Sequence, residues 1–322
     1  MEKLIKEIRN LNLLVIALMI IIFLVFMTRV IDVDHNKLQD LYNMTNVVVP
    51  ALTVFFVYKT FQNQQEQLST LRLQINKNDH AEKINQVEKR FFFFLQLHRD
   101  NVSSMSFQSQ IIGKRLFIKV IEKFERNYPR LQQILTENHN DTVHKFNEKE
   151  LIEINYKLIF YGFMNRQSAD ILKDSLQRYD RFMKNGTFSQ FIIEKLQSAG
   201  IKETGLQSNL GHYFRHFFHT VTYIHDIDKT LLSDDDKYFY LKRLRGQLTN
   251  QEIALLFINS FSIGRRWVHY DRIDEFTNDG VNLIEHYDLI KNLPEGFLKF
   301  DVKKYFPKTE FESRILADSP LN

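Results

Sequence analysis

The feature that most constrains this chain is an uninterrupted apolar run near its beginning, residues 13–27, with the sequence LLVIALMIIIFLVFM. With its flanks, residues 11–28, it reaches the length of about 18 residues that can span a hydrocarbon core. A cleaved signal peptide would also begin with basic residues and an apolar run, but no small-residue cleavage site follows here. We therefore predict a retained transmembrane helix.

A second stretch, residues 41–58, carries no formal charge and is predicted to return across the membrane. Its polar side chains, Asn43, Thr45 and Asn46, are expected to face each other or a water path, because such groups are costly towards lipid. A core helix of a soluble domain is the alternative interpretation, because the wholly apolar part of this stretch is short. Residues 1–59 thus form a predicted two-helix transmembrane hairpin.

Lysine and arginine predict the orientation of this hairpin. Both of its flanks are rich in basic residues, whereas the connecting loop has Arg29 and Lys37 offset by Asp32, Asp34 and Asp40. The positive-inside rule then places the N- and C-termini in the cytoplasm. The absence of cysteine agrees with a cytosolic body, since extracellular domains often carry disulfides.

The rest of the chain has the composition of a helical protein. Only ten Gly and five Pro occur in 322 residues, which disfavours a turn-rich β architecture. The net charge of +4 does not by itself point to nucleic acid. We predict an all-α fold with a helical linker at 60–90, a helical cytosolic subdomain at 91–200 and a helical C-terminal subdomain at 201–322.

The linker contains a short heptad pattern. Phe61, Leu68 and Ile75 fall seven residues apart, and the pattern ends at Asn78. A self-associating stalk and a single solvated helix are both compatible with this spacing.

Residues 211–228, GHYFRHFFHTVTYIHDID, predict an amphipathic helix with a polar stripe. At about 100° per residue, the stripe consists of His212, Arg215, His219, Thr222 and Asp226. The opposite, core-facing side consists of Phe214, Phe217, Val221 and Ile224. Such a stripe could bind phosphate-bearing ligands or nucleic acid. The alternatives are a buried hydrogen-bond network or a merely solvated face, because every amphipathic helix needs a polar side.

Arg215 and His219 would be the catalytic candidates if the chain were an enzyme, since an Arg–His pair on one helix resembles HEPN ribonucleases. Those enzymes place four to six residues between the two, whereas three separate them here, which disfavours the activity. A zinc site at His212, His216 and His219 is disfavoured too, because cysteine is absent and His216 lies well round the helix. We predict no cofactor and no metal.

Two smaller features are interpreted as structural. Residues 234–236, three consecutive Asp, precede a predicted helix start, where carboxylates favour the helix dipole, so capping is preferred over metal binding. Residues 265–267, Arg-Arg-Trp, form a basic and aromatic cluster of a size that suits a surface detail better than a nucleic-acid site.

Four segments together carry a family resemblance. They are 91–102 (FFFFLQLHRDNV), 211–228, 238–262 (YFYLKRLRGQLTNQEIALLFINSFS) and 283–294 (LIEHYDLIKNLP). Behind a membrane hairpin, they resemble the phage abortive infection (AbiC-like) family of bacteria. The resemblance implies defence against phage by a membrane-anchored protein that harms its own host cell, and it implies no particular chemistry.

Arg245, Gln247 and Glu252 match the pattern of that family and lie at a predicted helix junction. Thr249 followed by Glu252 predicts a capping box at the second helix of the junction. We expect the three residues to specify helix packing.

These observations predict a non-enzymatic effector in the bacterial inner membrane. The cytosolic domain would sense infection, and the hairpins, assembled from several copies of the chain, would compromise the membrane. The expected partners are the lipid bilayer, further copies of the chain, and either a phage-derived trigger or a neighbouring defence component such as a retron reverse transcriptase with its non-coding RNA. The alternatives are a membrane-tethered HEPN-like nuclease and a sensory or structural protein without toxicity.

Overall fold

The structure is a computed structural model of the chain, and it describes residues 15, 22, 25, 35–107, 110–137, 143–270 and 280–312. The chain divides into two compact units, Met1–Asp79 and His80–Asn322. The structure is mostly helical, which confirms the expected all-α class. The predicted subdomain boundary at residue 200 remains a prediction.

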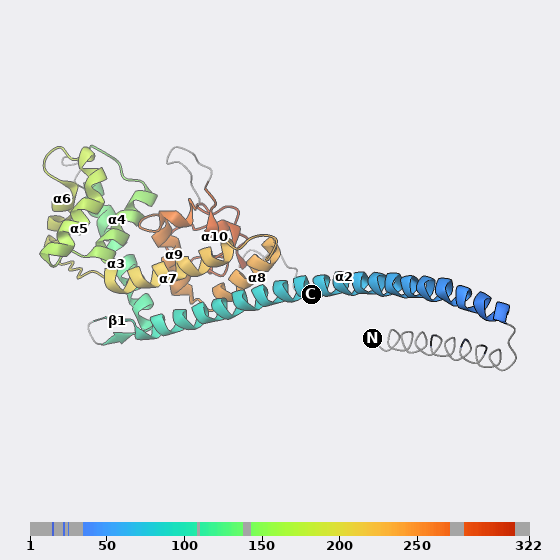
Figure 1. Cartoon of the computed structure of the whole chain (residues 1–322). Helices are drawn as coiled ribbons and strands as arrows, with labels where there is room; N and C mark the ends of the chain where they lie inside the picture. Colours follow the sequence, from blue (N-terminus) through green and yellow to red (C-terminus); the bar gives the residue numbers. More distant parts are fainter. Residues whose placement is uncertain are drawn as a thin grey trace, which may run out of the picture. The chain divides into compact units, whose positions relative to one another are not determined.

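Helix α2, His35–Ser104, is one continuous helix of 70 residues that includes Pro50 (Figure 1). It joins the predicted second span, the predicted linker and the start of the predicted cytosolic subdomain. The first predicted span, 11–28, lies outside the described residues except for three of its positions. Among the helices of the described residues, none is both long and apolar enough to cross a membrane. The helical state of 41–58 is thus confirmed and its membrane crossing is not supported, since its polar residues dilute the apolar ones.

A small antiparallel hairpin follows α2. Strands β1, Ser106–Phe107, and β2, Ile111–Ile112, pair with Ser106 opposite Ile112. Gly113, at a φ of +62°, then turns the chain into helix α3, Arg115–Glu137.

Helix α4, Glu148–Tyr161, is the centre of the second unit. It begins at the capping box formed by Asn147 and Glu150, and every residue from Leu151 to Phe160 is buried. Ile152, Tyr156 and Ile159 belong to one hydrophobic cluster, while Leu151, Ile154 and Leu158 belong to another. A helix that is buried all round separates two cores, and α4 does so here.

The smaller core lies between residues 131 and 201 and is built on α4 and the end of α3 by three further elements. These are α5, Arg166–Leu176, the 3₁₀ helix η1, Gln177–Phe182, and α6, Phe188–Ser198. The larger core uses the end of α2 and the C-terminal elements. These are α7, Gln207–His225, α8, Asp234–Arg245, α9, Asn250–Ser260, η2, Arg265–Trp267, and α10, Leu283–His286.

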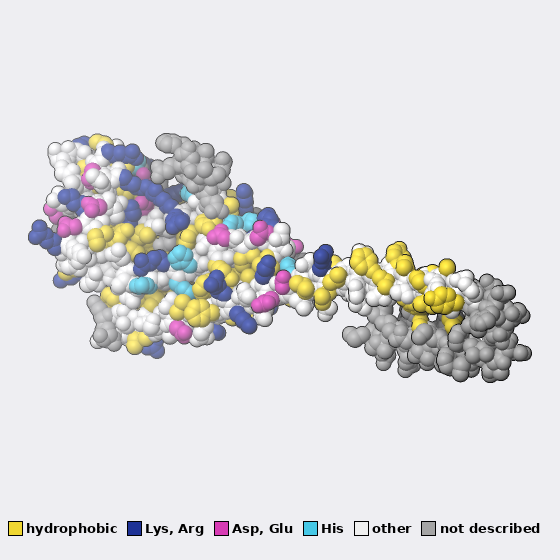
Figure 2. All heavy atoms as spheres, viewed as in Figure 1, with side chains coloured by type: hydrophobic (Ala, Val, Ile, Leu, Met, Phe, Trp, Pro, Cys, Tyr) yellow, Lys and Arg dark blue, Asp and Glu magenta, His cyan; other side chains and the backbone are white. Residues whose placement is uncertain are grey.

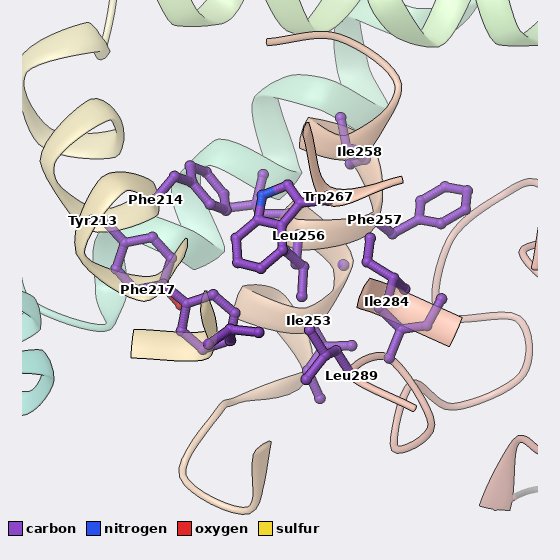
Figure 3. Packing of buried hydrophobic residues seen from close by; sticks show 14 of the residues in the cluster. Tyr213, Phe214, Phe217, Ile253, Leu256, Phe257, Ile258, Trp267, Ile284 and Leu289 are labelled. Atoms are coloured by element: carbon purple, nitrogen blue, oxygen red, sulfur yellow. The ribbon is translucent and has the colours of Figure 1, made fainter. Parts of the chain in front are cut away.

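Trp267, the only tryptophan of the chain, joins three elements of the larger core. Its ring centroid lies 5.5 Å from that of Phe217 and 4.8 Å from that of Phe218, both on α7. Figure 3 shows the Trp267 ring between Phe217 and Phe214 of α7 and Leu256 of α9. The turn after α9 is thereby fixed against α7.

A backbone crossing positions the start of α7 against the end of α4. Gly162 and Gly205 have φ values of +73° and +85°, and a Cβ atom on either would overlap the backbone of the opposite segment. The Leu206 amide donates to the Phe160 carbonyl at 2.8 Å, and the Phe163 amide donates to the Glu203 carbonyl at 2.8 Å. The approach requires glycine at both positions, because side chains rarely adopt this conformation and no space remains for one.

Candidate functional site

The polar stripe of α7 lies on the solvent side of that helix, as its spacing predicts. His212, Arg215 and His219 are exposed, and so is Asp226, the residue that caps the helix. Thr222 departs from the pattern, because it is buried and its hydroxyl donates to the His219 carbonyl at 3.4 Å. The predicted core-facing residues, Phe214, Phe217, Val221 and Ile224, are all buried. The amphipathic helix is confirmed, whereas ligand binding by the stripe stays a prediction.

Arg215 and His219 line a cleft of about 390 Å³, and Arg266 lines the same cleft from the turn after α9. The walls come from the end of α4, from α7, from α9 and from the segment that leads into η2. Basic and histidine side chains are visible along the face of α7 in Figure 2. Asp226 does not line the cleft, and its carboxylate accepts from the Tyr270 hydroxyl at 2.8 Å. The stripe is therefore divided between a cleft and a separate surface contact.

Glu252, one of the three helix-junction residues, is the centre of a buried network and is 1% exposed. One carboxylate oxygen accepts from the Tyr213 hydroxyl at 3.1 Å and lies 3.7 Å from His98 Nε2. The other accepts from the Thr249 amide at 2.8 Å and from the Thr249 hydroxyl at 2.9 Å. This geometry confirms the predicted capping box of Thr249 and Glu252. The carboxylate thus joins α2, α7 and the start of α9.

The protonation states in this network suit a structural contact. Burial alone would raise the pKa of Glu252, but the nearby His98 imidazole and the hydrogen bonds from Thr249 outweigh it and hold the pKa below its usual value. Burial, reinforced by the charge of Glu252, raises the pKa of Tyr213 well above its usual value. At neutral pH Glu252 is therefore an ionised acceptor and Tyr213 a protonated donor, so neither is poised to transfer a proton.

Arg245 and Gln247 also lie at the junction. Arg245 is buried, and its guanidinium donates to the Asp288 carbonyl at 2.8 Å, which fastens the segment after α10. The Gln247 side-chain oxygen is buried and has no hydrogen-bond partner among the described residues. Gln247 and Glu252 line a second pocket, whose rim includes Arg99.

His98 belongs to the Glu252 network, and the sequence pattern did not identify it as a member. It is 3% exposed, and its ring lies 5.4 Å from that of Tyr213 between centroids, at an angle of 50°. Its position in FFFFLQLHRDNV, one of the segments that carry the family resemblance, was the available signal. The structure brings that segment to Glu252, although the two residues are far apart in the sequence.

The two features interpreted as structural have different outcomes. The capping role of residues 234–236 is confirmed, because Asp236 forms a capping box with Ser233 at the start of α8. The interpretation of residues 265–267 as a surface detail is wrong for Trp267, which is 2% exposed and packs in the core. Arg265 forms an ion pair of 3.3 Å with the buried Glu153, whereas Arg266 faces the cleft.

The histidines of α7 do not gather around a common point. His216 Nε2 lies 3.1 Å from the Phe94 carbonyl, and burial lowers the pKa of His216. His212 and His219 are exposed instead. Within the part of the chain that the structure describes, no group of three or more His, Asp or Glu side chains is placed to hold a metal ion.

The first part of α2 exposes apolar side chains to an unusual extent. The exposed set in residues 47–58 consists of Val47, Val48, Val49, Val54, Phe55, Val57 and Tyr58. The heptad residues Phe61, Leu68 and Ile75 are exposed as well. Asn43 and Asn46 are exposed on the same helix, and the Thr45 hydroxyl donates to the Tyr42 carbonyl at 2.9 Å. Figure 2 shows hydrophobic side chains at several places along this helix, and we call the exposed apolar residues of 47–58 the apolar band of α2. Many exposed apolar side chains on one short segment are typical of an interaction site.

Residues 205–298 match the family model described as "putative phage abortive infection protein". The match extends from α7 to α10, so it contains the cleft face of α7 and both Arg245 and Glu252 of the junction. The family resemblance expected from the sequence is thereby confirmed over this segment. No curated protein and no solved structure matches the chain.

Proposed function

We propose that this chain, whose residues 205–298 match the abortive infection family, defends a bacterial cell against phage by compromising the inner membrane of that cell. In this proposal the second unit, His80–Asn322, senses infection, and residues 1–59 act on the membrane. Several copies of the chain take part. The trigger is a phage-derived component or a product of a neighbouring defence system, such as a retron reverse transcriptase with its non-coding RNA.

The single observation that carries the membrane part is the uncharged, exposed apolar band of α2. Val47, Val54 and Val57 have exposed fractions of 71%, 69% and 63%. Residues 41–58 contain no formal charge, and the wholly apolar run 13–27 precedes them in the chain. Apolar surface of this extent is unfavourable in water and favourable against lipid tails or a second copy.

The topology in this proposal follows from the basic residues. The hairpin has two passes, with the N- and C-termini in the cytoplasm. Lys and Arg flank it on both sides, whereas the basic residues of its connecting loop are offset by acidic ones. Asn43, Thr45 and Asn46 then face each other or a water path between copies, since amides and hydroxyls are costly towards lipid.

The test is to record membrane potential and nucleic-acid integrity in the same infected culture. We expect depolarisation to precede any loss of RNA or DNA. The double variant Asn43→Leu/Asn46→Leu should delay depolarisation, because an apolar face loses interhelical hydrogen bonds and any wettable path. Asn63→Leu/Asn76→Leu, which alters exposed amides of the same helix outside 41–58, is the matched control. Degraded nucleic acid in cells that are still polarised would overturn the proposal.

A membrane-tethered nuclease is the second candidate, and one observation favours it. Arg215 and His219 line one cleft together with Arg266, so a phosphodiester there would meet two guanidinium groups and an imidazole. The three residues between Arg215 and His219 depart from the HEPN spacing. If this candidate holds, the purified protein should degrade RNA or DNA, and His219→Ala should lower the rate about 10²–10⁴-fold without altering the fold.

A further inference from the structure

The cleft beside α7 has an unbalanced charge. Arg215, His219 and Arg266 line it, and none of its described lining residues is Asp or Glu. Arg215 is held by a hydrogen bond of 3.1 Å from its Nε to the Gly211 carbonyl, which leaves the outer guanidinium nitrogens to face solvent. Neither arginine forms an ion pair with the described residues of the chain. Two guanidinium groups without a counter-ion on one small cleft make it a site for an anion.

The two consecutive arginines, Arg265 and Arg266, have different surroundings. Arg265 makes an ion pair with the buried Glu153, at 3.3 Å, and contributes to the packing of η2 against α4. Arg266, the next residue, lies instead with its guanidinium carbon 5.2 Å from the centre of the Phe218 ring, on the cleft side. Only the second arginine of the pair is available to a ligand.

The other wall of the cleft is aromatic. Phe214, Phe218 and Trp267 line it, and the rings of Phe218 and Trp267 meet edge to face at 4.8 Å. At the base lies Asn259, 2% exposed, whose side-chain oxygen has no hydrogen-bond partner among the described residues. An apolar, aromatic wall with a few convergent polar groups is typical of small-ligand sites, whose volumes are about 300–1,000 Å³.

We propose that this cleft binds a nucleoside monophosphate, with the phosphate between Arg215 and Arg266 and the base against the aromatic wall. Arginine forks match phosphate oxygens, and every nucleobase offers a flat face that stacks on aromatic rings. A single phosphate suits the site better than a nucleic-acid strand, because both arginines line one cleft of about 390 Å³ and do not form an extended basic groove. This inference rests on the proposed function in one respect. Because the second unit senses infection in that proposal, the nucleotide bound in the cleft is the signal that it senses.

The single tryptophan makes binding directly observable. Trp267 is the one tryptophan of the sequence and lines the cleft, so a ligand bound there should change its fluorescence. We would titrate the full-length protein with AMP, GMP, CMP and UMP, and separately with adenosine, inorganic phosphate and a short single-stranded RNA. We expect saturable quenching by at least one monophosphate, and at least tenfold weaker binding of phosphate or nucleoside alone.

The variants are Arg266→Gln and Arg215→Gln, each of which removes one charged donor from the cleft. Each should weaken monophosphate binding by about tenfold to a hundredfold, the factor expected for a charge-assisted hydrogen bond. Arg243→Gln is the matched control, because Arg243 is an exposed arginine over an aromatic ring, Phe239 at 4.2 Å, on α8 and outside the cleft. The control should bind as the unaltered protein does.

Two results would overturn the inference. One is that none of the four monophosphates quenches the fluorescence saturably up to millimolar concentration. Binding of RNA alone would count as this result. The other is unchanged affinity in both Arg266→Gln and Arg215→Gln. The failure of the proposed function looks different: monophosphates would still bind and the variants would still weaken that binding, but infected cells would degrade their nucleic acid while still polarised.

Discussion

Helix α7 carries two polar regions with opposite surroundings. Tyr213 points into the molecule, where its hydroxyl donates to the buried Glu252. Arg215, two residues further on, lies in the exposed cleft with His219 and Arg266. Both oxygens of the Glu252 carboxylate are engaged by neighbouring donors, whereas the cleft arginines have no acidic partner in the described part of the chain.

The difference separates residues that hold the fold from residues that are free to bind. A buried carboxylate with all of its partners in place fixes three helices and has nothing left to offer a ligand. Exposed, unpaired cations contribute little to stability and are available for an anion. We therefore assign the Glu252 network to stability and the cleft to recognition, and the predictions below test that division.

The largest effect is expected from Glu252→Ala. It leaves Tyr213, Thr249 and His98 without their common acceptor inside the protein. Leaving buried donors without their acceptor costs about 1–3 kcal/mol for each group, so we expect the free energy of unfolding to fall by about 3–5 kcal/mol. Chemical denaturation of the full-length protein, followed by circular dichroism, measures it. A loss below about 1 kcal/mol, the scale of an ordinary exposed pair, would contradict the structural role.

The second prediction concerns the backbone crossing that positions α7 for both regions. Gly205→Ala places a side chain at a φ of +85° and against the Tyr161 carbonyl, so it should destabilise the protein by about 2–4 kcal/mol. Gly186→Ala is the matched control, because Gly186 has a φ of +71° but no atom within 4 Å of the added Cβ. If the two variants unfold at the same denaturant concentration, the close approach of the two backbone segments does not contribute to stability.

The third prediction distinguishes the regions by pH. The pKa of Glu252 is lower in the folded protein than its usual value of 4.5, so its stabilisation is fully present above the unfolded pKa. It is lost as the pH falls through the lower, folded pKa. The stability difference between the unaltered protein and Glu252→Gln should be constant from pH 7 to about pH 5 and should shrink below about pH 4.5. A difference that stays constant under acid would argue against an ionised Glu252.

The smallest stability effect is expected in the cleft. Arg215→Gln and Arg266→Gln should each change the free energy of unfolding by less than about 1 kcal/mol, because exposed side chains without ion pairs contribute little. The same denaturation experiment applies. If either variant lowered the free energy of unfolding as much as Glu252→Ala does, the cleft would also be a stabilising region, and the division would be wrong.

Local patterns in the sequence predict the parts of this architecture that depend on neighbouring residues. The 3.6-residue period places His212, Arg215 and His219 on the outside of α7, and the Thr249–Glu252 spacing predicts the start of α9. Trp267 was misjudged, because three residues of loop sequence do not reveal that a ring will pack between α7 and α9.

Long-range pairings could not be predicted, since no periodicity connects them. The contact of His98 with Glu252 joins residues on α2 and α9, and the Gly162–Gly205 crossing joins segments on either side of α5 and α6. The cleft depends on the same kind of pairing, because Arg266 reaches it from beyond α9. The sequence suggested the α7 residues of the candidate site and did not suggest the other wall.

The most direct test of this division is phage protection by cells that express the double variant Arg215→Gln/Arg266→Gln, measured as efficiency of plating. Protein accumulation and unfolding midpoint are recorded alongside, with Arg243→Gln as the control. The account predicts that the double variant accumulates and unfolds as the unaltered protein does but loses protection, while the control retains it. Full protection by a stable double variant would contradict the assignment of recognition to the cleft.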